Sequence, residues 1–210
     1  MRVLLLIIID FMMVQCKTSE NFAVTKQKKF KYSCQLFCDS LNIRRPDFST
    51  VDLEIRVWYG LLHSGDHSFL KIQRIKDGSW RGESTQFNFY GPSHFDFNSQ
   101  FRAITFTRNW SNTWEEIVAK DYLNLPTQDD VDKRIIEKHS FKQTVFFGDG
   151  NYYIIEALTK NAKRKIIYSN PELYSEQYLK QGINSVDYSA FFNFISLLND
   201  EFKFKKKLVN

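Results

Sequence analysis

The sequence predicts an α+β fold, in which a mainly antiparallel β-meander sheet carries helices packed on one face. Aromatic residues make up 16% of the chain, and aromatic side chains suit a pleated, half-buried surface. Segments of alternating polarity are joined by turn signals such as Asp77-Gly78. Helical periodicity occurs in separate stretches and ends with an amphipathic helix over residues 186–202. These three observations together favour an α+β fold.

The first fifteen residues have the composition of a secretory signal. A basic start is followed by an apolar run, interrupted by Asp10, that is too short to span a membrane. The run stops at Cys16, and polar residues follow it. We therefore expect a lipoprotein-type signal peptide over residues 1–15, lipidation of Cys16 and a tether over residues 16–32. The mature chain would be anchored in the cell envelope, facing the periplasm or the cell surface. Plain secretion and a cytosolic or otherwise anchored chain are the alternatives.

Residues 33–210 are expected to form a single α+β domain, because their length suits one core and no composition break divides them. Residues 33–41 predict a short helix that contains Cys34 and Cys38. An exported protein can join such cysteines in a disulfide. However, this spacing on a regular helix fits the narrow disulfide geometry poorly. A Cys34–Cys38 disulfide and two buried thiols remain equal alternatives.

The first strand is predicted over residues 52–59, by strict alternation of apolar and polar side chains. Half-burial is expected: one face carries Leu53, Ile55, Val57 and Tyr59, and the other carries Glu54, Arg56 and Trp58. Further strands are predicted over residues 68–76, 79–90, 102–107 and 141–147. A helix capped at Asn112-Thr113 follows the fourth of these five strands, and Thr127 with Asp130 resembles a capping box for another.

The clearest structural pattern runs over residues 148–182. It predicts a turn, a strand, a short loop, a second strand and a helix. Adjacent isoleucines place apolar side chains on both faces of each strand, which is typical of interior strands. Asn170 is a suitable N-cap, Pro171 a suitable first helical residue and Gly182 a suitable stop. All of these features are structural, so function is expected elsewhere.

One stretch, HSGDH over residues 63–67, resembles a metal site. His63, Asp66 and His67 supply two imidazoles and a carboxylate. The spacing brings both rings together only on a helix, and Gly65 between two predicted strands argues against one. A polar hairpin loop is the favoured interpretation, so we expect no metal and no cofactor.

The sequence contains no G-x-S-x-G nucleophile motif and no phosphate-binding loop of the GxxxxGKS or GxGxxG kind. No catalytic residue is therefore assigned, and the sequence leans against an enzyme without excluding one. The net charge of +5 is modest and spread along the chain, except for a basic run over residues 203–207. A solvated terminus is the favoured interpretation of that run, with contact to anionic lipid as the alternative. Nucleic acid is not expected as a partner.

Four motifs occur in a fixed order: Arg56-Val57-Trp58, Leu125-Pro126, DGNYYIIE over residues 149–156 and YSNP over residues 168–171. With them the chain resembles exported proteins and lipoproteins of Bacteroidota-type bacteria, over most of residues 50–200. The motifs are structural. The resemblance therefore implies an exported α+β domain, and it carries over no catalytic residue.

The sequence as a whole favours a non-enzymatic interaction module, held at the membrane by lipid on Cys16. A protein or a glycan is the expected partner, and inhibition or immunity against a toxin is one form that the role could take. Two alternatives remain: a cell-envelope hydrolase or glycan-processing protein with a dispersed site, and a structural component of the envelope.

Overall fold

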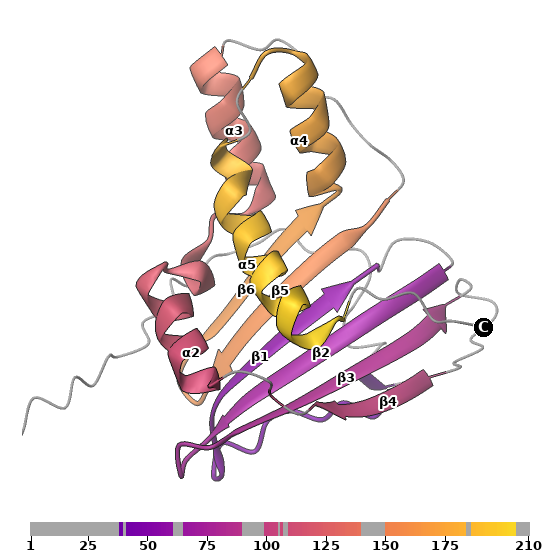
Figure 1. Ribbon diagram of the computed structural model, residues 1–210, viewed down its shortest axis with the longest axis vertical. Coiled ribbons are helices and arrows are strands. Elements are labelled where there is room, and N and C mark those ends of the chain that lie inside the picture. Colours follow the sequence, from indigo (N-terminus) through magenta and orange to yellow (C-terminus); the bar gives the residue numbers. More distant parts are fainter. Residues whose placement is uncertain are drawn as a thin grey trace, which may run out of the picture.

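The computed structural model describes residues 38–39, 41–60, 65–89, 99–104, 106, 109–139, 150–183 and 186–204. Within them, six strands form one sheet in the order β4-β3-β2-β1-β5-β6 (Figure 1). The strands are β1 (Val51–Tyr59), β2 (Gly65–Ile75), β3 (Trp80–Phe89), β4 (Ser99–Ile104), β5 (Tyr152–Thr159) and β6 (Lys163–Ser169). The helical elements are α2 (Trp110–Ala119), the 3-10 helix η2 (Tyr122–Asn124), α3 (Gln128–His139), α4 (Pro171–Lys180) and α5 (Val186–Phe202). The predicted α+β fold class is confirmed.

The sheet is assembled from two antiparallel pieces. Strands β1 to β4 form a meander, in which each strand pairs with the next along the chain. The chain then passes through α2, η2 and α3 before it returns to the sheet. The β5–β6 hairpin pairs with the other side of β1, again antiparallel. Strand β1 is therefore the centre of the sheet, although it comes first in the chain.

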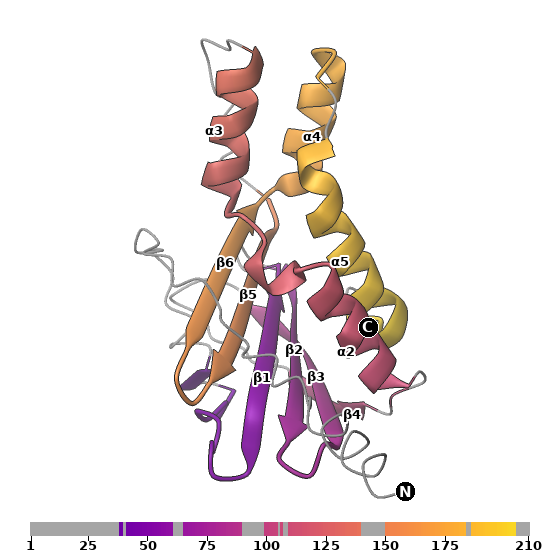
Figure 2. The same cartoon turned by 90° about the vertical axis from the view of Figure 1, so that its left-hand side faces the viewer.

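The helices occupy two places. Helices α2 and α5 lie on one side of the sheet, and α3 and α4 stand beyond one end of its strands (Figure 2). The amphipathic C-terminal helix covers the sheet as predicted, with its bounds at residues 186 and 202. Phe191 of α5 is fully buried and its ring stacks on Tyr168 of β6 at 4.0 Å between centroids. Tyr153 of β5 meets the same ring edge-on at 5.1 Å.

Strand β1 is buried on both faces, so the expected half-burial is wrong for it. Leu53, Ile55 and Val57 face the helices and are fully buried. On the opposite face the exposed fractions are 1% for Glu54 and 6% for Arg56, and Trp58 is also fully buried. The alternation correctly identified which residues share a face. It could not show that a second layer of chain covers the polar face.

Strand β2 begins earlier than predicted. Gly65, Asp66 and His67 belong to it and pair with β3, where His67 lies opposite Phe87. Residues 65–67 therefore form no exposed loop, and His67 is buried with its ring stacked on Phe87 at 5.3 Å. A similar shift affects the fourth strand, which spans residues 99–104 in place of the expected 102–107.

Helix α2 begins at Trp110, and its N-cap is Asn109 in place of the predicted Asn112-Thr113. The Asn109 side chain accepts a hydrogen bond from the Ser111 backbone N–H at 3.2 Å. The earlier start brings Trp110 into the core, 4.9 Å from the ring of Phe202. The predicted capping box of α3 is confirmed. The Thr127 hydroxyl accepts from the Asp130 N–H, and the Asp130 carboxylate accepts from the Thr127 N–H.

The junction between β6 and α4 is built differently from the prediction. Asn170 occupies the N-cap position, but it adopts the left-handed conformation and its side chain makes no capping hydrogen bond. That side chain lies directly over Gly150, where an added Cβ would come within 1.5 Å of the Asn170 Oδ1 atom. The other end of α4 is as predicted: Gly182 has a positive φ, and the Ile183 N–H returns to the Tyr178 carbonyl at 2.8 Å.

Several predictions fall outside the described residues. They concern the signal peptide, the tether, Cys16, Cys34, His63 and the strand over residues 141–147. Of the helix predicted over residues 33–41, Cys38, Asp39 and Leu41 are described; Cys38 and Asp39 are helical, and Leu41 lies in a turn. The single domain over residues 33–210 stays a prediction as well.

Candidate functional site

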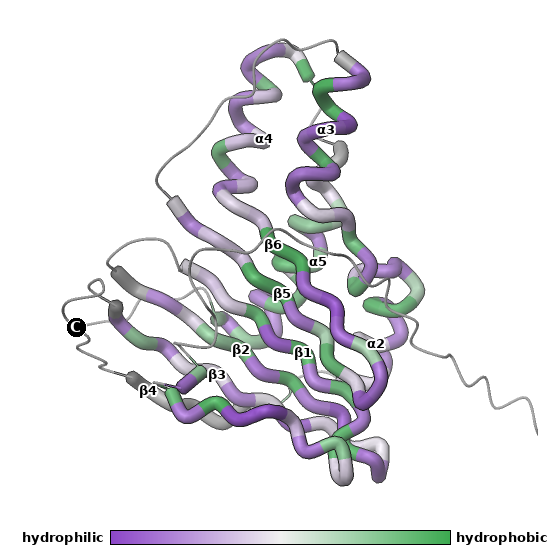
Figure 3. Tube along the Cα trace, turned by 180° about the vertical axis from the view of Figure 1, so that it is seen from behind, coloured by the Kyte–Doolittle hydropathy of each residue, from purple (hydrophilic) through white to green (hydrophobic). Residues whose placement is uncertain are grey.

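The sheet face opposite α2 and α5 carries a row of charged side chains, and we call it the charged face. Arg56 of β1 lies between Lys71 of β2 and Glu156 of β5 in the strand register. Lys71 in turn lies opposite Glu83 of β3, and Glu156 opposite Lys165 of β6. The row therefore crosses five strands with no apolar residue in it. Figure 3 views the molecule from this side, with the strands in front of α5.

A chain of polar contacts connects this face with the segment that precedes β1. Arg81 of β3 donates to the amide oxygen of Gln73, and the Gln73 amide donates to Glu54. Glu54 also accepts from the Arg56 Nε atom. Arg56 then donates from Nη2 to the Arg44 carbonyl oxygen at 2.6 Å. Because a polar or charged group buried without a partner is costly, these contacts offset part of the cost of burying Glu54 and Arg56.

The other half of the charged face is apolar. Its buried members are Cys38, Trp58, Phe69, Phe87 and Ile154. Leu41 and Ile43 pack against this cluster, and Trp58 contacts Phe69 at 4.1 Å between ring centroids. The segment before β1 is thus held twice, by apolar packing through Leu41 and Ile43 and by the Arg56 hydrogen bond to Arg44. This double attachment holds the described residues 38–39 and 41–45 against the sheet.

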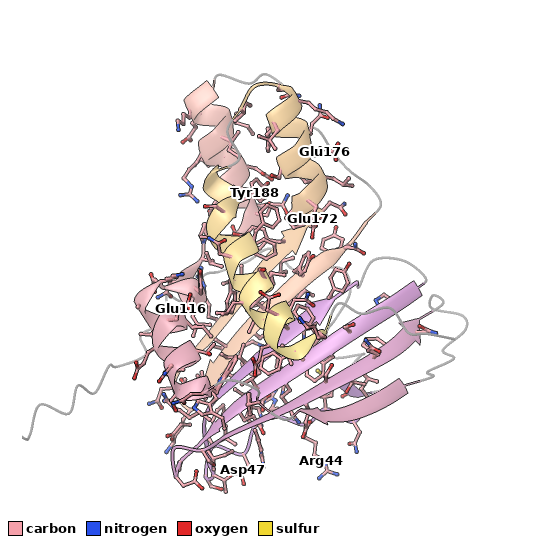
Figure 4. All side chains as sticks on the ribbon, viewed as in Figure 1. Arg44, Asp47, Glu116, Glu172, Glu176 and Tyr188 are labelled. Carbon is pink, nitrogen blue, oxygen red and sulfur yellow. The ribbon has the colours of Figure 1, made fainter. Side chains whose placement is uncertain are left out.

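A hollow of about 370 Å³ lies where this segment meets the sheet. It is lined by Cys38, Asp39, Asn42, Ile43, Arg44, Arg45 and Arg56. Arg44 and Arg45 are exposed, and Figure 4 shows the Arg44 side chain pointing away from the strands. Arg56 is buried beneath them. The hollow therefore has a fixed arginine at its base and two exposed arginines at its rim.

Positive charge exceeds negative charge on this face. Its described cationic side chains include Arg44, Arg45, Arg56, Lys71, Arg81, Lys163 and Lys165, and its described anionic side chains include Asp39, Asp52, Glu54, Glu83 and Glu156. Ion pairs join Glu54 to Arg56, Glu83 to Lys71, and Glu156 to Lys163, the last at 3.2 Å. The exposed arginines therefore determine the local field.

A second group of ionisable side chains ties the helices together. The Tyr188 hydroxyl of α5 donates to the Asp132 carboxylate of α3 at 2.5 Å. Burial raises the pKa of Asp132, and the hydrogen bond from Tyr188 opposes that rise. Tyr153 of β5 donates to Glu172 of α4, and burial raises the pKa of the Tyr153 hydroxyl. Figure 4 shows Tyr188 and Glu172 on these helices, far from Arg44. The first contact joins α5 to α3, and the second joins α4 to strand β5.

The predicted metal-site residues are not brought together in the described structure. His63 lies outside it, and for Asp66 it describes the backbone only. His67 is buried against Phe87. Across the described ranges, no three His, Cys, Asp or Glu side chains are grouped so that they could hold a metal ion. Cys38 is buried next to Arg56, whose Nη1 atom lies 3.8 Å from its Sγ. The disulfide to Cys34 and the lipid on Cys16 stay predictions.

Sequence reasoning missed the residues that form the hollow. Arg44 and Arg45 stood in a stretch without periodicity, and Arg56 was assigned to a solvent-facing side. One signal was present, because Trp58 shares the face of Glu54 and Arg56 and a tryptophan seldom faces water alone. That signal indicates burial of the face, but it does not identify the segment that covers it.

Comparison of the chain with protein-family models, with curated proteins and with solved structures finds no match. The helices in the described part of the chain are too short or too polar to cross a membrane. The functional argument therefore depends on the geometry of the charged face.

Proposed function

We propose that this chain is an exported, lipid-anchored and non-enzymatic interaction module that contacts an anionic partner through the charged face. One observation carries the proposal: the polar chain from Arg81 to Arg56 ends on the Arg44 carbonyl and holds the arginine-bearing segment in place. Charges that are fixed before binding lose little conformational freedom on association. Complementary charge also guides encounter and selects the partner. A preorganised cationic surface is therefore suited to recognition.

The anchor is the second part of the proposal. Lipid on Cys16 would hold the module at a membrane, with the charged face connected to the tether through residues 38–45. A protein that is bound and inhibited there, as in immunity against a toxin, is one form of partner that this arrangement suits. The two ion pairs at the sides of the hollow, Lys71–Glu83 and Lys163–Glu156, keep the neighbouring surface mixed in charge. The partner is therefore expected to have a localised negative group.

Metabolic labelling with radioactive palmitate tests the anchor. The wild-type chain should carry the label and sediment with membranes, and the Cys16→Ser variant should do neither. A wild-type chain that remains unlabelled and soluble would exclude the anchor.

Site-specific photocrosslinking in cells tests the face. A photoreactive residue at Lys163 on the charged face should give a discrete, salt-sensitive crosslinked product. The matched position is Glu176, an exposed residue of α4 on the far side of the molecule (Figure 4). Products of equal yield from both positions, or from Glu176 alone, would reject the charged face as the contact surface.

A further inference from the structure

The hollow beside β1 combines three features that seldom occur together by packing alone. It has an open volume of about 370 Å³, a buried arginine in its wall and two exposed arginines within the same short segment. The apolar contacts of Ile43 lie to one side of it. Arg44 and Arg45 follow directly, so the fixed position of Ile43 also limits where the two guanidinium groups can reach.

Arg56 has hydrogen-bonding capacity beyond its structural contacts. A guanidinium group carries five N–H bonds. Three are directed to the Glu54 carboxylate, the Cys38 sulfur and the Arg44 carbonyl oxygen. Each terminal nitrogen has two hydrogens and uses one of them in these contacts. Two of the five N–H bonds are therefore not used by these contacts, and Arg56 lines the hollow.

Charge limits the chemistry of that ligand. Glu54 neutralises Arg56, so the excess positive charge comes from Arg44 and Arg45 at the rim. Asp39 lines the same hollow and opposes them in part. A compact anion with several acceptor oxygens meets these donors better than an extended apolar group does. Arginine forks match phosphate and carboxylate oxygens in geometry, and phosphate has more oxygens and more charge to share among several arginines.

We propose that this hollow is a binding site for a phosphate group. The site specifies the anionic group of the interaction proposed above, and its membrane source rests on that proposed function. If Cys16 is lipidated, roughly 20 residues separate the membrane anchor from Cys38 in the wall of the hollow. Fully extended, a chain of that length spans at most about 70 Å. Phospholipid headgroups are then within reach of the hollow, and free phosphate is the other source of the same chemistry.

A titration with inorganic phosphate tests the site without the anchor. The full chain carrying Cys16→Ser is titrated at constant ionic strength and followed by amide chemical shifts. Shifts are expected to concentrate at residues 38–45 and 56. The double variant Arg44→Ala/Arg45→Ala should weaken binding about tenfold or more, since each arginine supplies a charge-assisted hydrogen bond. Arg134→Ala removes an exposed arginine of α3, outside the hollow and outside the polar chain, and should change the affinity less than twofold.

Two further titrations test whether the hollow binds phosphate in particular. Asp39→Asn removes the opposing charge and should strengthen phosphate binding several-fold. Acetate at the same ionic strength should bind more weakly than phosphate, because it offers fewer oxygens and a single charge. An unchanged affinity in Arg44→Ala/Arg45→Ala, equal effects of that variant and Arg134→Ala, or tighter binding of acetate would each overturn the site.

Vesicles distinguish the two sources of phosphate. The same Cys16→Ser chain is mixed with phosphatidylcholine vesicles that contain or lack phosphatidic acid, which exposes a phosphate monoester. Cosedimentation that depends on phosphatidic acid and on Arg44 and Arg45 identifies the headgroup as the source. Phosphate binding without cosedimentation identifies free phosphate. Cosedimentation lost in Lys205→Ala/Lys206→Ala/Lys207→Ala but kept in Arg44→Ala/Arg45→Ala assigns lipid binding to the basic terminus and rejects the headgroup for the hollow.

The outcomes for the anchor and for the hollow are separable. If palmitate labelling fails and the phosphate titration succeeds, the lipid-anchored function is wrong and the anion site stands. If labelling succeeds and the titration shows no binding, the lipid anchor stands and the phosphate site is rejected.

Discussion

The two faces of the sheet are buried by different means. On the helix-covered face, Leu53, Ile55 and Val57 meet an aromatic layer from α5, and the contacts are apolar throughout. On the charged face, β1 presents Glu54 and Arg56 to a hydrogen-bonded network and to the short segment before β1. Strand β1 therefore contributes buried side chains to both faces of the sheet. Apolar packing tolerates approximate fits, whereas a buried ion pair requires every partner to be in place.

The largest effect is expected on the helix-covered face. Phe191→Ala removes a fully buried ring that contacts Tyr168 and Tyr153, and should lower the free energy of unfolding by about 3–5 kcal/mol. Urea denaturation measures this loss. The neighbouring Phe192 is half-buried, so Phe192→Ala is the matched control and should cost roughly half as much or less. Equal losses would mean that α5 does not direct residue 191 into the core.

A substitution on the charged face should lower the free energy of unfolding almost as much, because it removes one partner of a buried ion pair. Arg56→Met keeps most of the side-chain volume but leaves Glu54 buried without its cation, and should cost about 3 kcal/mol or more. The double variant Glu54→Gln/Arg56→Met removes both charges and should recover most of that loss. Urea denaturation of both variants measures the difference. A double variant no more stable than Arg56→Met would show that the guanidinium acts by packing and not by charge.

Substitution of His67 tests whether this residue lies in a polar loop, as the sequence predicted, or is buried in strand β2. As a member of a polar loop it would be replaceable at no cost. Buried in β2 and stacked on Phe87, it makes His67→Ala destabilising by about 1–3 kcal/mol in thermal or urea unfolding. Lys76→Ala, an exposed residue after the same strand, should stay within about 0.5 kcal/mol of the wild type. A neutral His67→Ala would restore the loop interpretation.

The smallest expected effect is a pH dependence of stability that arises from Asp132 of α3. Burial is the main cause that raises the pKa of Asp132 in the folded state. Folding therefore favours the protonated carboxyl, and this contribution to stability is complete below the unfolded-state pKa and is lost as pH rises through the folded-state pKa. Asp132→Asn cannot titrate and can still accept from Tyr188. Its stability relative to the wild type should therefore rise with pH across that window. Parallel stability curves over a pH series would contradict this origin.

The long periodic elements were predictable from the sequence. Alternation over residues 52–59 located β1 within one residue, and the apolar stripe gave α5 its bounds, because each pattern repeats several times. The start of α2 was not predictable locally, since Asn109, Asn112 and Thr113 are all capping residues. The choice is made by Trp110, which gains burial against Phe202 only if the helix starts early.

The candidate site was less predictable than the fold. Glu54 and Arg56 looked solvent-facing, because alternation describes one strand and carries no information about its neighbours. Their burial depends on Gln73 from β2, on β5 about a hundred residues later and on the segment that precedes β1. No local sequence pattern encodes contacts between segments that lie so far apart in the chain. The arginine-lined hollow is a property of the assembled sheet.

The contact between Gly150 and Asn170 has a consequence for sequence divergence. Any side chain at position 150 would occupy the space of the Asn170 amide, and Asn170 also receives the chain from β6 and donates its N–H to the Asn151 carbonyl. The two positions should therefore show strong epistasis. Replacement of Gly150 alone would displace Asn170 and disturb the start of α4. In divergent sequences with this fold, substitutions at positions 150 and 170 should therefore occur together.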